Sequence, residues 1–251
     1  MNAATISVLL DLNHLFYQRF GRSFAETRRR IQPGVRRVLE ALPEEGAWLE
    51  LGCGSGWLAM EWASAFDKGG SYLGLDFSET LLEEARRNAA GLAKEIRFEQ
   101  ADLSDPGWAS GLAPGSFDGV LAFAVLHHLP GPEVRRRVLR QVRTLLKPQG
   151  FFIHSEWQFQ HSPKLMARRL PWELAGLSEA EVDEGDTLLD WRAENKDGDG
   201  SSNLTGLRYV HLFSREELAD LARECGFEIV EEFESDGQGG RLGLYQKWIL
   251  T

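Results

Sequence analysis

The chain has few cysteines, no long hydrophobic run and no excess of positive charge. Its 251 residues include two cysteines, Cys53 and Cys225, which cannot form a disulfide framework and whose spacing matches no zinc signature. The longest apolar runs, such as residues 117–126, are about half as long as a membrane-spanning helix requires. No basic stretch followed by an apolar stretch opens the chain, so we expect no secretion signal and a reducing, cytoplasmic setting.

The balance of charge narrows the range of partners. There are 38 acidic and 28 basic residues, giving a formal net charge of −10, which produces no long-range attraction to nucleic acid or anionic membrane. A local basic site remains compatible with this charge. The sequence also contains no repeat period, which excludes solenoid folds. We therefore expect a globular protein with no membrane partner, while its oligomeric state stays open.

From residue 47 onward, short apolar strands alternate with helical segments. Strands are predicted at residues 47–51, 71–75, 96–99, 117–123, 151–154, 228–234 and 243–250. Helices are predicted near residues 57–65, 79–88 and 133–146, and a further one starts at Ser214, where Glu217 completes a capping box. Such alternation predicts an α/β fold with a mostly parallel sheet and helices on both faces.

Two segments stand apart from this alternation. Residues 1–45 are predicted as an N-terminal helical cap, with one helix that stops at Gly21 and a second over residues 24–42 that is interrupted near Pro33. Residues 46–251 form the main domain. Within it, residues 156–205 are acidic and rich in tryptophan, and we interpret them as an inserted, lid-like segment.

The strongest chemical signal is a glycine-rich turn that follows the first strand, in Trp48-Leu49-Glu50-Leu51-Gly52-Cys53-Gly54-Ser55-Gly56. Glycines let the backbone approach a ligand closely, and the next helix directs unpaired amides at the turn. Asp76 closes the second strand and Asp102 follows the third. Because the carboxyl ends of parallel strands meet at one edge of a sheet, the turn and both acids predict a nucleotide-like cofactor site, with Asp76 accepting ribose hydroxyls.

The cofactor site could belong to an enzyme that transfers a chemical group from its cofactor, and two alternatives to such an enzyme are open. A nicotinamide dinucleotide site needs the pattern G-x-G-x-x-G, which would place its third glycine at position 57, where Trp57 stands. That scheme also leaves Glu50, Asp102 and the pair His127-His128 without a role. A non-catalytic cofactor-binding module is the second alternative, and it predicts binding without turnover.

These motifs resemble those of the class I S-adenosylmethionine-dependent methyltransferases. Residues 117–120 and 126–129 are similar to the fourth-strand motif of that family, and residues 146–150 are similar to the turn before its fifth strand. The resemblance implies a Rossmann-like, seven-stranded sheet whose last strand is antiparallel, and S-adenosyl-L-methionine as the cofactor. The residues implied to bind it are Glu50, Gly52, Cys53, Gly54, Gly56, Asp76, Phe77, Asp102 and Leu103.

A narrower resemblance lies on both sides of this core. Residues 24–28 and 32–35, together with Arg208-Tyr209-Val210-His211, are similar to elements of the tRNA wobble-uridine carboxymethyl methyltransferases. That group methylates the carboxylate of a modified uridine, so a tRNA acceptor is one implication. The acidic balance of the chain favours the other, a small molecule such as a metabolite or a lipid-like acid.

Five residues are candidates for the acceptor side or for a carboxylate clamp. His128 follows the fourth strand, where the acceptor should meet the methyl group, and a histidine can serve there as a general base. Arg28 can hold the cofactor carboxylate or the acceptor in a bidentate clamp. The narrower resemblance adds Arg208, Tyr209 and His211 to the acceptor side. We expect no metal, because adjacent histidines chelate poorly and no third ligand is evident.

Overall fold

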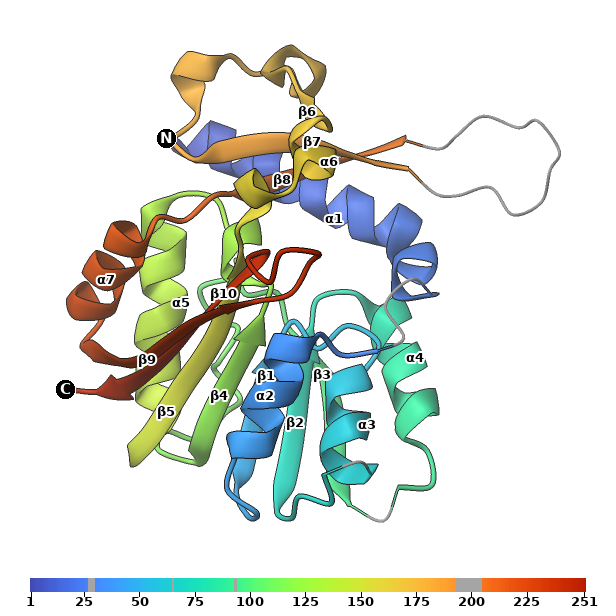
Figure 1. Cartoon of the computed structure of the whole chain (residues 1–251), viewed down its shortest axis with the longest axis vertical. Helices are drawn as coiled ribbons and strands as arrows, with labels where there is room; N and C mark the ends of the chain where they lie inside the picture. Colours follow the sequence, from blue (N-terminus) through green and yellow to red (C-terminus); the bar gives the residue numbers. More distant parts are fainter. Residues whose placement is uncertain (27–29, 65, 93, 193–204) are drawn as a thin grey trace, which may run out of the picture.

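The computed structural model describes residues 1–26, 30–64, 66–92, 94–192 and 205–251. Its centre is a seven-stranded sheet in the order β3-β2-β1-β4-β5-β10-β9 (Figure 1). Strand β10 runs antiparallel to both of its neighbours, β5 and β9. The predicted Rossmann-like fold with an antiparallel last strand is confirmed. The strands are β1 (Ala47–Leu51), β2 (Ser71–Asp76), β3 (Glu95–Gln100), β4 (Phe117–Phe123), β5 (Leu146–Trp157), β9 (Phe227–Ser235) and β10 (Gly243–Leu250).

Helices cover both faces of this sheet, as the alternation of the sequence predicts. Strand β1 shows why, because Trp48 packs into one hydrophobic core while Leu49 and Leu51 pack into the other. The helices of the Trp48 side are α2 (Pro33–Ala41), α3 (Trp57–Ser64) and α4 (Glu79–Ala89), and those of the Leu49 side are α5 (Pro132–Leu145) and α7 (Arg215–Glu224). Central strands covered by helices on both faces need apolar side chains on both faces.

The N-terminal segment differs from its prediction. Helix α1 (Ala3–Glu26) runs through Gly21 without stopping. Gly21 is buried near the start of α4, where an added Cβ would lie 3.7 Å from the Leu81 side chain, so packing outweighs the roughly 1 kcal/mol that a glycine costs a helix. The second helix, α2, begins at Pro33 instead of being interrupted there, since proline suits the first helical position. No helix in the described part of the chain is long and apolar enough to cross a membrane.

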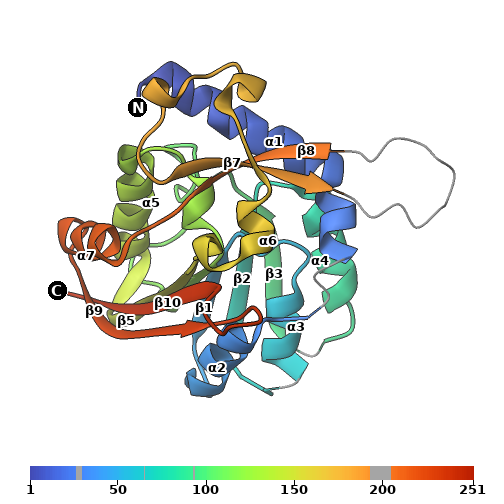
Figure 2. The ribbon, with the colours of Figure 1, turned by 45° about the horizontal axis from the view of Figure 1, so that its top comes forward.

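The segment predicted as an insertion contains most of a second, three-stranded sheet, which we call the lid sheet. It consists of β6 (Arg169–Leu170), β7 (Asp186–Arg192) and β8 (Thr205–His211), so it extends beyond the predicted boundary. The short helices of this region are η2 (Phe159–His161), α6 (Pro163–Met166), η3 (Trp172–Ala175) and η4 (Glu179–Glu181). Figures 1 and 2 show α1 and the lid sheet lying side by side above the main sheet. Leu9 of α1 packs there with Trp172 and Tyr209.

A buried ionic network connects the lid sheet to the main domain. The guanidinium of Arg135 on α5 is 2% exposed and donates to the Tyr209 hydroxyl at 3.1 Å and to Glu217 at 3.1 Å. Tyr209 in turn donates to Asp186 at 2.7 Å, and His211 lies between Asp186 and Glu217. Ser214 caps α7 as predicted, but the Glu217 side chain bonds Arg135 and His211 and leaves the capping box half formed.

We expect Arg135→Ala to lower the free energy of unfolding by about 3–5 kcal/mol, because it leaves Asp186 and Glu217 without their buried cation. Arg136→Ala is the matched control. The Arg136 side chain is 25% exposed and pairs with Glu133 and Glu224 at the surface, so its loss should cost about 1 kcal/mol or less. Urea denaturation of both variants measures the difference, and equal losses would contradict this account of the network.

Candidate active site

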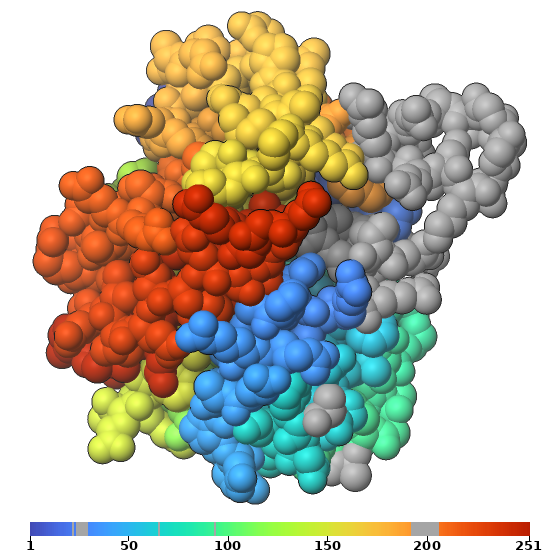
Figure 3. All heavy atoms as spheres, viewed as in Figure 1, coloured from blue at the N-terminus to red at the C-terminus, as the bar shows by residue number. Residues whose placement is uncertain are grey.

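A cavity of about 580 Å³ lies at the carboxyl edge of the main sheet. Its lining brings together nine of the residues singled out in the sequence, from several segments of the chain. They are Glu50, Gly52, Cys53, Gly54, Asp76, Phe77, Asp102, Leu103 and His128. Further lining residues come from α1 and from the hairpin between β9 and β10, so the cavity has walls on several sides. In the space-filling view, the insertion, the C-terminal hairpin and α2 meet on one face of the molecule (Figure 3).

The three glycines of the turn are needed for different reasons. All have positive φ, which side chains with a Cβ rarely adopt: +68° at Gly52, +53° at Gly54 and +78° at Gly56. A Cβ on Gly52 would lie 2.7 Å from Val125, and one on Gly56 would lie 2.9 Å from Ala85 of α4. A Cβ on Gly54 would meet nothing within 4 Å, because that side of the turn faces open space in the cavity. Gly54 therefore offers a cradle that a ligand can occupy, whereas Gly56 serves packing.

Asp76 connects the glycine turn to the start of α4. Its two carboxylate oxygens accept the amides of Gly54 and Ser78, each at 2.9 Å. Burial raises the pKa of Asp76 to about 6, although the amides of Ser78, Gly54 and Phe77 oppose this shift. Glu50 is buried beside it and accepts the Tyr72 hydroxyl at 2.7 Å. Burial raises the pKa of Glu50 to about 8, so the cavity holds two acids that ionise with difficulty.

Helix α1 covers the Asp102 end of the cavity. The Nε2 atom of His14 lies 3.1 Å from Asp102, and the His14 ring lies 4.8 Å from the Phe77 ring. Partial burial opposes ionisation of Asp102, but hydrogen bonds from His14 and Ser104 together outweigh it and lower its pKa to about 2. The hydrogen bond to Asp102 also raises the pKa of His14. Asp102 is thus an anion at neutral pH.

His128 also lines the cavity and belongs to the short helix η1 (Leu126–His128). Its Nε2 atom is 3.3 Å from the hydroxyl of Tyr17 on α1, and its Nδ1 atom is 3.2 Å from the backbone oxygen of Tyr209 on β8. Cys53 also lines the cavity, but burial raises the pKa of its thiol well above the usual range. His128 is therefore the better placed of the two for proton transfer.

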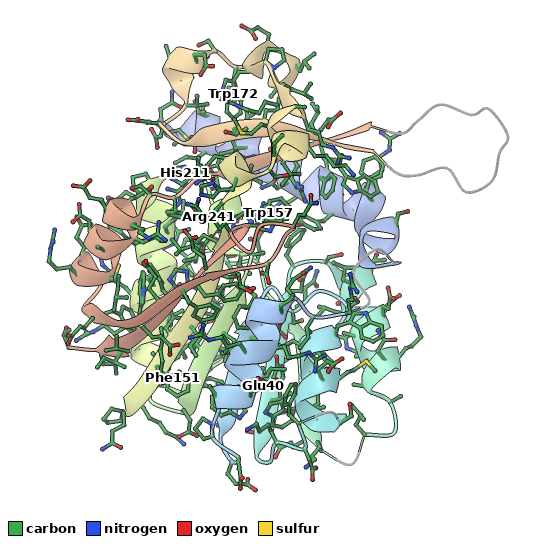
Figure 4. All side chains as sticks on the ribbon, viewed as in Figure 1. Glu40, Phe151, Trp157, Trp172, His211 and Arg241 are labelled. Atoms are coloured by element: carbon green, nitrogen blue, oxygen red, sulfur yellow. The ribbon has the colours of Figure 1, made fainter. Side chains whose placement is uncertain are left out.

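Three of the remaining candidates, Arg208, Tyr209 and His211, are not among the described residues that line the cavity. The side chains of Tyr209 and His211 belong to the Arg135 network, and neither is among the described residues that line the cavity. Arg208 is buried with its guanidinium 4.7 Å from the ring centroid of Trp157, which does line the cavity. Figure 4 places Trp157 between the lid sheet and the main sheet. Arg28 lies outside the described residues.

Sequence reasoning missed the contribution of α1. Asn13, His14 and Tyr17 all line the cavity from this helix. Their positions are one, three and four residues apart, so they share one helical face, and this group of polar side chains beside the apolar residues of the helix was the available signal. Among the described residues, no group of three or more histidine, cysteine, aspartate or glutamate side chains is placed to hold a metal ion.

Comparison with known proteins assigns the family. A family model described as a methyltransferase domain matches residues 23–232. The chain belongs to the methyltransferase domain family. It is 30% identical over 221 residues to a methyltransferase-family protein of Encephalitozoon cuniculi, covering 87% of this chain and 88% of that one. It is 23% identical over 229 residues to the tRNA (carboxymethyluridine(34)-5-O)-methyltransferase of Schizosaccharomyces pombe, covering 87% and 89%.

A solved structure shows the same fold. The 1,6-didemethyltoxoflavin-N1-methyltransferase of Burkholderia thailandensis, solved with 1,6-didemethyltoxoflavin and S-adenosylhomocysteine, matches with a TM-score of 0.66 at 20% identity. The match covers 100% of this chain and 91% of that one. The predicted enzyme class is confirmed, and the S-adenosylhomocysteine bound to this neighbour is the demethylated form of the predicted cofactor.

We expect Asp76→Asn to weaken the binding of S-adenosylhomocysteine about 10- to 100-fold, as for a lost charged hydrogen bond. In the unchanged protein the affinity should fall by about tenfold per pH unit below pH 6, because protonation removes the carboxylate acceptor. The Asp76→Asn variant lacks this titration, so the difference between the two curves isolates Asp76 from His14. Calorimetric titration between pH 5 and 7 measures both effects. Parallel curves would show that Asp76 is not the titrating group.

Proposed function

We propose that this methyltransferase transfers a methyl group from S-adenosylmethionine to a small molecule bound inside the cavity. The observation that carries this proposal is the roof over the site. Helix α1 contacts Asp102 of the predicted donor site through His14 and the acceptor-side His128 through Tyr17, and its residues Asn13, His14 and Tyr17 line the cavity. A small acceptor can fit under such a roof, whereas a large one would have to displace it.

The run of three arginines at residues 135–137 supports the same choice. A tRNA acceptor needs a local basic surface to contact phosphates. Arg135 is buried in the ionic network, Arg136 pairs with Glu133 and Glu224, and Arg137 donates to the backbone oxygen of Ser104. All three arginines at residues 135–137 thus make contacts within the chain and do not form a basic surface for phosphates.

The residues present fit S-adenosylmethionine, because Gly54 leaves a cradle open and acids lie at or just beyond the carboxyl ends of three neighbouring strands. Gly52 and Gly54 would allow its close approach, Asp76 would accept ribose hydroxyls, and Asp102 and Phe77 would flank the adenine. The bound donor supplies a methyl group on a positively charged sulfur. The protein's own contribution is to hold the acceptor in line with that methyl group and to exclude water, and positioning of this kind can supply much of the catalysis.

A tRNA wobble uridine is the second candidate acceptor. The relative from Schizosaccharomyces pombe supports it, because the similarity extends over 87% of this chain. The Arg208–His211 element also agrees with that group in position. Against it stands the placement of Tyr209 and His211, whose side chains take part in the network of Arg135.

Labelled S-adenosylmethionine distinguishes these two acceptors. The protein is incubated with methyl-tritiated donor and either bulk tRNA or a protein-free metabolite extract, and acid precipitation then separates labelled RNA from labelled small molecules. We expect label in the acid-soluble fraction, in a product distinct from the donor. The Asp76→Asn variant, which should bind the donor weakly, is the control for non-enzymatic transfer. Label in precipitated tRNA alone would instead support the wobble-uridine acceptor.

A further inference from the structure

Asn13 joins three separate parts of the active site through its side chain. This residue of α1 is 5% exposed. Its Nδ2 atom donates to the backbone oxygens of Tyr209 and His128, both at 3.2 Å, and its Oδ1 atom accepts the Tyr209 amide at 2.9 Å. Asn13 thus connects the roof helix, the lid strand β8 and the turn that carries His128. The donor site described above assigns no role to this buried amide.

The same backbone oxygen of Tyr209 determines which nitrogen of His128 carries the proton. It lies 3.2 Å from His128 Nδ1. A carbonyl oxygen can only accept, so Nδ1 must be the donor. In the neutral ring the other nitrogen, Nε2, then carries the lone pair, and the Tyr17 hydroxyl at 3.3 Å can donate to it. His128 and the Tyr17 that bonds this nitrogen both line the cavity, where the proposed acceptor would bind.

We propose that Asn13 is a positioning residue that holds His128 in this tautomer, and that the acceptor is a hydroxyl or an N–H group. This inference rests on the proposed function and specifies its acceptor. A carboxylate is already ionised at neutral pH and needs no base. A hydroxyl or N–H acceptor must lose a proton during transfer, and a fixed base at His128 Nε2 supplies the place for it.

The step balances as follows for an acceptor X–H. The lone pair of X forms the new X–CH3 bond while the bond between the methyl carbon and sulfur breaks, and its electron pair stays on sulfur. The proton of X moves to His128 Nε2, where the acceptor has replaced the Tyr17 hydrogen bond. The resulting imidazolium keeps its Nδ1 bond to Tyr209 and later releases the Nε2 proton to water.

Nitrogen-15 NMR of the histidine side chains tests the tautomer without any acceptor. We expect His128 at neutral pH to show a protonated Nδ1 and an unprotonated Nε2, with the signal assigned by its loss in His128→Gln. In Asn13→Ala the signal should move toward a mixture of both tautomers, because the Tyr209 backbone loses both of its hydrogen bonds to the Asn13 side chain and its carbonyl oxygen is less firmly positioned against His128. An unprotonated Nδ1 in the unchanged protein overturns the proposal, and so does an unaltered tautomer in Asn13→Ala.

Two controls separate this effect from general damage. Tyr17→Phe removes a polar group from the same helix but leaves the Tyr209 oxygen in place, so His128 should keep its Nδ1 proton. His127 is the internal reference, since its Nδ1 atom bonds buried Glu156 at 2.8 Å, independently of Asn13. Calorimetry with S-adenosylhomocysteine reports separately on the donor site. If the unchanged protein does not bind that ligand, the proposed function fails, whatever the tautomer is.

The stability of the product in alkali tests the acceptor class. Methyl esters of carboxylates release volatile methanol in mild alkali, whereas methyl ethers and N-methyl groups do not. After incubation of the protein with labelled donor and the metabolite extract, we expect the label of the product to remain non-volatile. His128→Gln should reduce that labelling at least tenfold while the affinity for S-adenosylhomocysteine changes less than threefold. Release of the label as methanol overturns the proposal.

Discussion

The structure depends on how the open carboxyl edge of its parallel sheet is closed. The strand order reverses beside β1, since β2 lies on one side of it and β4 on the other, and the segments that follow these strands leave a crevice between them. This arrangement provides the floor of the cavity, made of the glycine turn and the acids Glu50, Asp76 and Asp102, but it provides no roof. The roof comes from α1, which the Asn13 side chain joins to β8, a strand distant in sequence. The hydrogen bonds of the Asn13 side chain therefore hold the roof in place and position the turn that carries His128.

The floor could be predicted from the sequence because its signals are local. Each strand is followed at once by the residues that act at its end, so the spacing from Gly54 to Asp76 and Asp102 is sufficient to group them. The roof could not be predicted in this way. The helical period of α1 indicates which side is apolar, but not that Asn13 meets Tyr209, 196 residues away. Gly21 shows the same limit, because contact with Leu81 of α4 outweighs the local preference for a helix end.

The Arg208–His211 element shows that a resemblance can locate a segment without indicating which contacts its side chains make. In a strand, successive side chains point to opposite faces, so Tyr209 and His211 share the face that meets Arg135, while Arg208 lies over Trp157. The contribution of Tyr209 to the cavity is its backbone oxygen on His128. Residue types alone do not reveal such a role, because every residue carries a carbonyl group. The Tyr209 side chain instead keeps β8 attached to α5.

The buried acids of the floor, Glu50 and Asp76, ionise more easily when a positively charged ligand is bound than when the site is empty. Because the pKa of Asp76 in the folded chain is about 6, above its ordinary 3.8, the folded chain binds this proton more tightly than the unfolded chain does. The contribution of Asp76 to stability is therefore lost as the pH rises through 6. The contribution of Glu50, whose pKa is raised to about 8, is lost in the same way as the pH rises through 8. A sulfonium centre nearby favours the ionised form of both acids and offsets the cost of their burial. The same burial that weakens the empty floor thus strengthens its attraction for a cationic donor, which explains why a stable fold retains two buried acids at this edge.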